Sequence, residues 1–135
     1  MTTTLNAVSG TGLVQTSDGS GIVKLQSNSV TTNALAWVNF NGVTTATIRA
    51  SYNVSSVTRN GTGDYTVNFA TALADANYVP LVTQQRTANG TTVTFPNISS
   101  TTAPTTSAVR VGNDGSGATT TSADAAIFCV VIFGN

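Results

Sequence analysis

The sequence contains no histidine and no glutamate, and it has a single cysteine. A zinc centre is built from clusters of histidine, cysteine and carboxylate side chains, which this composition cannot supply. A Ser-His-Asp or Cys-His catalytic arrangement lacks its base for the same reason. The lone Cys129 excludes an internal disulfide, and its apolar neighbours predict a buried, unreactive thiol. We therefore expect no metal ion, no cofactor and no enzymatic activity.

Charged residues are also scarce. Five basic residues balance five acidic ones, so only 7% of the 135 residues are charged, against about 25% in an average soluble domain. A nucleic-acid-binding protein needs a basic surface that displaces counterions, so nucleic acid is not an expected partner. The longest apolar run, 125–133, is too short to cross a bilayer. Residues 1–5 lack the basic start and apolar core of a signal peptide, so we expect neither a membrane partner nor secretion.

Threonine, serine, asparagine and glycine supply the polarity that charges usually supply. Threonine is β-branched and favours strands, whereas asparagine and glycine favour turns. Short alternating segments recur along the chain, separated by glycine-containing turns. This pattern predicts an all-β protein with a single antiparallel β-sandwich, jelly-roll-like, over residues 34–135. Residues 1–33 are predicted to form an N-terminal β-element or hairpin and a linker arm.

Several local features of the sandwich can be predicted. Residues 36–40 and 65–69 alternate clearly between apolar and polar side chains, and 60–64 is a strong hairpin signal. A bulge near Ser55–Ser56 would reconcile the valines on either side of it with strand alternation. Pro80 cannot donate to a sheet ladder, which places its strand at a sheet edge or a bulge.

Two further hairpins are predicted in the C-terminal half. Residues 88–90 would turn the strand at 78–85 back onto the segment that follows. Residues 113–117 would join a strand at 108–111 to the closing strand at 125–133.

The closing strand is apolar on both of its faces, which indicates that both faces need cover. A small sandwich covers only one face of each sheet. The second face therefore predicts a subunit interface, the alternative being a central strand capped by loops. Burying three such side chains would contribute on the order of 5 kcal/mol or more per chain. The candidate interface residues are Ile127, Phe128, Val130, Val131, Ile132 and Phe133.

Two runs of sequence carry a resemblance to a known type of protein. The residues AWVNFNG at 36–42 and IRASYNVSSVTRNGTGDYTVNF at 48–69 resemble a bacteriophage virion β-domain, of the kind found in tail-fibre and other structural proteins of marine and freshwater phages. Residues 11–27 are similar to a short β-element that precedes such domains, and 78–82 and 126–134 are similar to their closing strands. The resemblance implies an all-β, usually homotrimeric domain on the virion surface. It carries over no catalytic residues.

Ligand contact is best sought in the turns, because loops carried on a rigid scaffold often bind. A host-surface glycan is the candidate ligand, and plain structural turns are the alternative. Sugar stacking on Trp37, Tyr52, Tyr65 or Tyr78 is a further possibility, against the alternative that these rings belong to the core or an interface. The candidate ligand-binding residues are Asn60, Thr62, Asp64, Asn89, Asn113 and Asp114.

Three functions follow from these observations. The first is a homotrimeric tail-fibre-type protein of the virion surface that mediates host attachment and is assembled in the host cytoplasm with other virion proteins. The second is a capsid decoration protein that stabilises the head. It is favoured by the short stretch between Met1 and the first β-element, because a typical fibre chain has a long N-terminal anchor and shaft. The third, a sugar-degrading enzyme, is disfavoured because the five aspartates are scattered among turns.

Overall fold

The computed structural model describes residues 26–27, 30–31, 33–85, 94–115 and 122–134. Strands are the only regular elements in these residues, and every pairing is antiparallel. No helix in the described residues is long and apolar enough to cross a membrane. The strands are β1 (Gln26–Ser27), β2 (Val30–Thr31), β3 (Ala36–Asn41), β4 (Thr47–Tyr52), β5 (Val54–Gly61), β6 (Asp64–Phe69), β7 (Val79–Gln84), β8 (Thr94–Ile98), β9 (Ala108–Gly115) and β10 (Phe128–Phe133).

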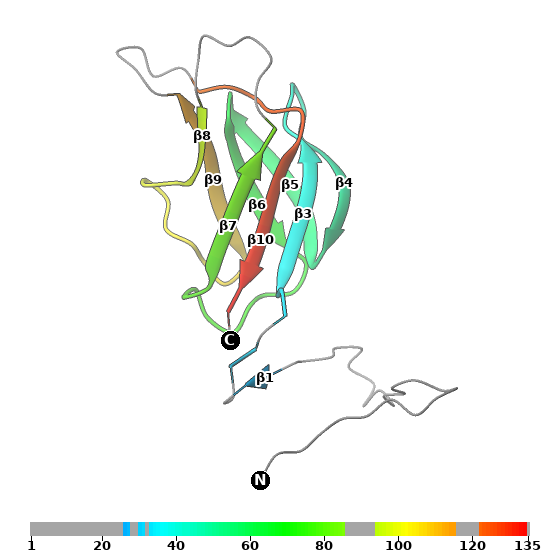
Figure 1. The fold of residues 1–135 in the computed structure, drawn as a ribbon, viewed down its shortest axis with the longest axis vertical. Helices are drawn as coiled ribbons and strands as arrows, with labels where there is room; N and C mark the ends of the chain where they lie inside the picture. The colour runs from blue at the N-terminus through cyan, green and yellow to red at the C-terminus, as the bar shows by residue number, and fades with distance from the viewer. Residues whose placement is uncertain (1–25, 28–29, 32, 86–93, 116–121, 135) are drawn as a thin grey trace, which may run out of the picture.

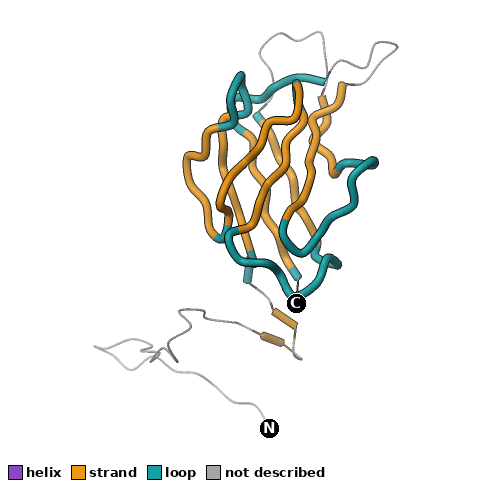
Figure 2. The backbone as a smooth tube through the Cα atoms, turned by 180° about the vertical axis from the view of Figure 1, so that it is seen from behind, coloured by secondary structure: helices purple, strands orange, loops and turns teal. Residues whose placement is uncertain are grey.

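Eight of the strands form two four-stranded sheets, packed face to face (Figure 1). The first sheet has the order β4-β3-β10-β7 and the second has the order β5-β6-β9-β8. Connecting segments join the strands mainly at the two ends of the sandwich (Figure 2). The predicted all-β antiparallel sandwich is therefore confirmed. The remaining strands, β1 and β2, form a separate two-stranded pair within the region predicted as an N-terminal β-element or hairpin and a linker arm.

Side-chain alternation explains where the core lies. In β3 and β6 every second residue is buried, which confirms the faces predicted for 36–40 and 65–69. Three rings fill one end of the core. Tyr65 meets Phe40 edge-on at 5.1 Å between ring centroids, and Phe128 lies 5.3 Å from both. The other fully or nearly buried apolar residues are Ala36, Val38, Val67, Phe69, Tyr78, Val109, Val111, Ala125, Val130 and Ile132.

Three local predictions are confirmed. Strands β5 and β6 pair across the 60–64 hairpin. Their register shifts between Val54 and Ser56, at the predicted bulge. Pro80 lies in β7, which is an edge strand of the first sheet.

The two predicted C-terminal hairpins are wrong. Strand β9 pairs with β6 and β8, whereas β10 pairs with β3 and β7 in the opposite sheet. Strands β7 and β8 likewise belong to different sheets. The chain therefore passes from one sheet to the other between β7 and β8 and again between β9 and β10. Of the two predicted turns, 88–90 and 116–117 lie outside the described residues, whereas 113–115 belong to β9 itself. A turn motif reports a change of direction but not which strand receives the hydrogen bonds.

Candidate functional site

The outer face of the first sheet carries a continuous row of apolar side chains, one from each strand. Trp37 on β3 lies opposite Tyr52 on β4 and opposite Val131 on β10, and Val131 lies opposite Leu81 on β7. Val79 and Phe133 form a second pair beside this row. We call these six residues the apolar face.

Most of the apolar face is open to solvent. Trp37 is 39% exposed, Tyr52 46% and Leu81 53%. The four strands beneath it contain one charged residue, Arg49, whose Nη1 donates to Asn39 Oδ1 at 3.3 Å. Isolated apolar residues on a surface need no explanation, but a contiguous row rimmed by polar groups marks an interaction site.

The closing strand divides between the two sides of the sheet. Phe128, Val130 and Ile132 are at most 1% exposed, because they point at the second sheet. These three were predicted at a subunit interface, and that prediction is wrong: the chain covers them itself. Val131 and Phe133 lie on the apolar face, and Ile127, just before the strand, is 39% exposed. For these three an interface remains a prediction. Cys129 also faces outward and is half-buried, not buried as predicted.

The outer face of the second sheet is polar and hollowed. A groove of about 570 Å³ crosses the end of β6, β9 and β8 next to the β5–β6 turn. We call it the polar groove. It is lined by Gly61, Thr62, Gly63, Asp64, Asn97, Ile98, Ser99, Ser100, Thr101, Arg110, Gly112, Asp114 and Ser122.

Hydrogen bonds fix both carboxylates of the polar groove. Arg110 donates from Nε to Asp64 Oδ1 at 2.8 Å and from Nη2 to Oδ2, a bidentate pair. These hydrogen bonds from Arg110, assisted by Asn60 and opposed by partial burial, hold the pKa of Asp64 below its ordinary value. Asp114 accepts from Asn97 Nδ2 at 2.9 Å and from Ser122 Oγ at 3.1 Å.

The floor of the polar groove is Gly112. In the sheet register it lies between Asp64 on β6 and Asn97 on β8. A Cβ at this position would sit 2.7 Å from Asn97 Oδ1, so a side chain here would displace the Asn97 amide and fill the hollow. The groove exists because this outward position carries no side chain.

The sequence-predicted ligand residues are only partly brought together. Thr62, Asp64 and Asp114 line the polar groove, and Asn60 donates to Asp64 Oδ1 at 3.3 Å from its edge. Asn113 is fully buried, so its prediction as a turn-tip contact is wrong. It belongs to β9, where Asp114 points outward and Asn113 points inward. Asn89 lies outside the described residues.

Three important groove residues were not predicted: Asn97, Arg110 and Gly112. Each lies inside a strand, whereas ligand contacts were predicted in turns. The VRVGND run of β9 held a usable signal, because arginine, glycine and aspartate alternate with the inward residues.

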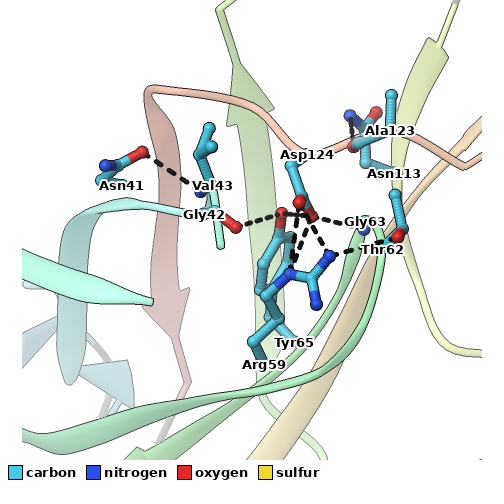
Figure 3. Close-up of polar contacts among 10 residues, drawn as sticks. All are labelled: Asn41, Gly42, Val43, Arg59, Thr62, Gly63, Tyr65, Asn113, Ala123 and Asp124. Carbon is cyan, nitrogen blue, oxygen red and sulfur yellow. Dashed lines mark hydrogen bonds and ion pairs between the residues drawn. The ribbon is translucent and has the colours of Figure 1, made fainter. Parts of the chain in front are cut away.

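A second polar cluster closes one end of the sandwich (Figure 3). Asp124 accepts from Arg59 Nη2 at 2.8 Å, from the Gly63 backbone N–H at 2.8 Å and from the Tyr65 hydroxyl at 2.9 Å. Burial alone would raise the pKa of Asp124, but these hydrogen bonds and the charge of Arg59 hold it below its ordinary value. Burial, and then Asp124 itself, raise the pKa of Tyr65. With its lone pairs occupied by the chain, Asp124 ties the segment before β10 to the β5–β6 turn and is not a ligand site.

The aromatic candidates for sugar stacking separate clearly. Tyr65 is fully buried and Tyr78 is 6% exposed, so neither can stack on a ligand. Trp37 and Tyr52 belong to the apolar face. In the described residues there is no group of three or more histidine, cysteine or acidic side chains that could hold a metal ion.

Comparison with protein-family models, with curated proteins and with solved structures finds no match to this chain.

Proposed function

We propose that this protein is a structural protein of a bacteriophage virion surface, of the tail-fibre type, which assembles with copies of itself into a homotrimer and contributes to host attachment. The observation that carries the assembly part of this proposal is the apolar face. The virion part rests on the sequence resemblance of 36–42 and 48–69 to phage β-domains.

The apolar face suits a second copy of the same chain. Identical copies carry identical charges, so a charged face would repel its own copy, whereas here Arg49 is the only charged residue in four strands. Trp37 and Leu81 are about half exposed, so burying what remains exposed contributes about 1 kcal/mol for each side chain. The outer surface of the other sheet has no comparable row of apolar side chains, because its polar groove is lined mostly by charged, amide and hydroxyl groups.

The second candidate is a capsid decoration protein, in which the apolar face would pack on other head proteins. It is favoured by the compactness of the sandwich, whose eight strands lie between Ala36 and Phe133. Gold-labelled antibody on intact particles separates the two, because label on the head and not on the tail would exclude the fibre assignment.

The assembly part is tested by the molar mass of the purified full chain, measured by light scattering over a range of concentrations. The expected mass is three times the 13.7 kDa chain mass. Val131→Asp places a charge at the centre of the apolar face and should give a folded monomer. Thr83→Asp, also exposed on β7 but outside the row, is the matched control and should remain assembled. A wild-type chain that stays monomeric at high concentration would overturn the assembly proposal.

A further inference from the structure

We propose that the polar groove on the β5-β6-β9-β8 sheet is a binding site for a neutral saccharide chain. This inference deepens the proposed attachment role by naming a site and a ligand class. It does not depend on trimer formation, because the groove lies on the opposite side of the sandwich from the apolar face.

The size and the chemistry of the groove favour a ligand rich in hydroxyl groups. Its volume of about 570 Å³ falls within the roughly 300 to 1,000 Å³ of typical ligand sites. Such sites are usually lined by apolar side chains, but here Ile98 is the only large apolar residue in the lining. Apart from three glycines, the rest is two carboxylates, a guanidinium, a side-chain amide and several hydroxyls. Sugar hydroxyls both donate and accept hydrogen bonds, so they match such a lining, whereas an apolar ligand would leave it unpaired.

The charges of the groove disfavour an acidic ligand. Its charged groups are Asp64, Asp114 and Arg110, so two negative charges face one positive charge. The positive charge is already engaged in a bidentate pair with Asp64. A phosphate, sulfate or uronate would meet Asp114 without a free cation opposite, whereas a neutral sugar meets no such repulsion.

The groove is also preorganised. Asp64 is held by Arg110, and Asp114 is held by Asn97 and Ser122, so the acceptors need not be immobilised when a ligand binds. A carboxylate offers about four lone-pair positions, and Asp114 uses two of them on these donors. The remaining positions can accept from sugar hydroxyls, and Asn97 Oδ1 points over the bare floor at Gly112.

An aromatic ring lies at the edge of this site. Phe95 lies opposite Asp114 in the β8–β9 register and is 54% exposed. An exposed ring beside hydrogen-bonding groups can cover the apolar C–H face of a sugar while its hydroxyls are bound. The groove is open on its solvent side, which suits one or two units of a longer chain more than an enclosed monosaccharide.

The test is an NMR titration of the full chain, isotopically labelled, with maltohexaose, cellohexaose, laminarihexaose and mannohexaose, each up to about 10 mM, since weak single sites have Kd values near the millimolar range. At least one of the four should produce saturable shifts centred on Asn97 and Gly112. Asn97→Ala should weaken that binding by about fivefold or more. Asn68→Ala removes a half-buried amide from the same sheet face at the far end of β6, and it should leave the affinity unchanged.

Gly112→Ala provides a second variant that does not require loss of any hydrogen-bonding side chain. It should reduce binding because the added Cβ occupies the floor. A charged probe, oligogalacturonate of similar length, should bind more weakly than the neutral chain. The inference is overturned if none of the four neutral chains gives saturable shifts, if the shifts centre on Trp37 and Tyr52, or if the uronate binds more tightly.

Failure of this inference can be told apart from failure of the assembly proposal. The Val131→Asp variant, if monomeric, should still bind the saccharide with the single-site affinity of wild type. A wild-type trimer that binds no saccharide would contradict only the groove assignment. A wild-type monomer that binds saccharide would contradict only the assembly proposal.

Discussion

Replacing Tyr65 by phenylalanine tests how much the Asp124 cluster contributes to stability. The substitution removes one hydroxyl and leaves the ring packed against Phe40 and Phe128. That hydroxyl lies 2.9 Å from Asp124 Oδ1 and 3.2 Å from the Gly42 carbonyl oxygen. A hydroxyl has a single proton, so the shorter contact to the charged oxygen is the main hydrogen bond that is lost.

The expected cost can be worked out from this geometry. A hydrogen bond to a charged group contributes about 1.5 to 3 kcal/mol. Asp124 keeps its contacts with Arg59 and the Gly63 N–H, and 16% of its side chain is exposed, so the loss lies toward the lower end. We expect the free energy of unfolding to fall by about 1 to 2 kcal/mol and the melting temperature to fall by about 3 to 10 °C. Urea unfolding at pH 7 measures the first and calorimetry measures the second.

The pH dependence distinguishes a charged acceptor from a merely polar one. The folded-state pKa of Asp124 lies below its unfolded value. Its contribution is therefore complete above about pH 4 and is lost as the pH falls through the folded pKa. The difference between wild type and Tyr65→Phe should shrink as the pH falls through the folded-state pKa of Asp124, because protonation removes the charge on the acceptor.

Tyr78→Phe is the matched control for this experiment. The Tyr78 hydroxyl lies 3.0 Å from the carbonyl oxygens of Thr105 and Ala108, which carry no charge. Its loss should cost about 1 kcal/mol at every acidic pH. The reasoning is refuted if Tyr65→Phe leaves the stability unchanged at pH 7, or if its cost relative to Tyr78→Phe does not shrink anywhere as the pH is lowered to the point of acid unfolding.

Other substitutions test the packing and the charge distribution. Ile132→Asp puts a carboxyl group into the core at a position that is 1% exposed. The loss of packing alone costs about 2 to 5 kcal/mol, so circular dichroism should show an unfolded chain. Val131→Asp, on the apolar face, should keep the wild-type spectrum. Gly63→Ala should lower the free energy of unfolding, measured by urea titration, by about 2 kcal/mol or more. Gly63 has a φ of 66°, and an added Cβ would lie 2.9 Å from two backbone carbonyl oxygens. Gly61→Ala, with open space around it, should change the free energy of unfolding by less than about 0.5 kcal/mol. Between pH 5 and 8 the melting temperature should vary by less than about 10 °C, because the chain has no histidine or glutamate and the paired aspartates titrate at lower pH.

The layers of the fold were predictable because their signal is local. Alternation of apolar and polar residues fixes which side of a strand is buried, and it identified the inward faces of β3 and β6 correctly. The edge position of β7 and the bulge in β5 were predictable for the same reason, since each depends on a few neighbouring residues. Strand pairing was not predictable from turn motifs, since β9 and β10 follow one another in the chain but lie in opposite sheets.

The candidate site was harder to predict because it depends on register. Asp64, Gly112 and Asn97 come from three strands and form one row only after β6, β9 and β8 have paired. The apolar strand β10 raised the opposite difficulty. Its two apolar faces were recognised, but the sequence could not say which of them the second sheet would cover. From the sequence alone, Phe128, Val130 and Ile132 could equally well face outward. The position of the second sheet decides that they face inward.

The two outer faces of the sandwich differ in a way that suits assembly and ligand contact at the same time. The four strands of the first sheet contain one charged residue, whereas those of the second contain Arg59, Asp64, Arg110 and Asp114. If copies associate through the apolar face, the polar grooves point away from the shared contact and stay accessible. Weak single sites then act together, and linked sites can raise the overall avidity by about 10² to 10⁴ without any new contact. A trimer should therefore adhere to a surface coated with the bound saccharide far more tightly than the Val131→Asp monomer, although both have the same single-site affinity. Equal retention of trimer and monomer on such a surface would show that the grooves do not act together.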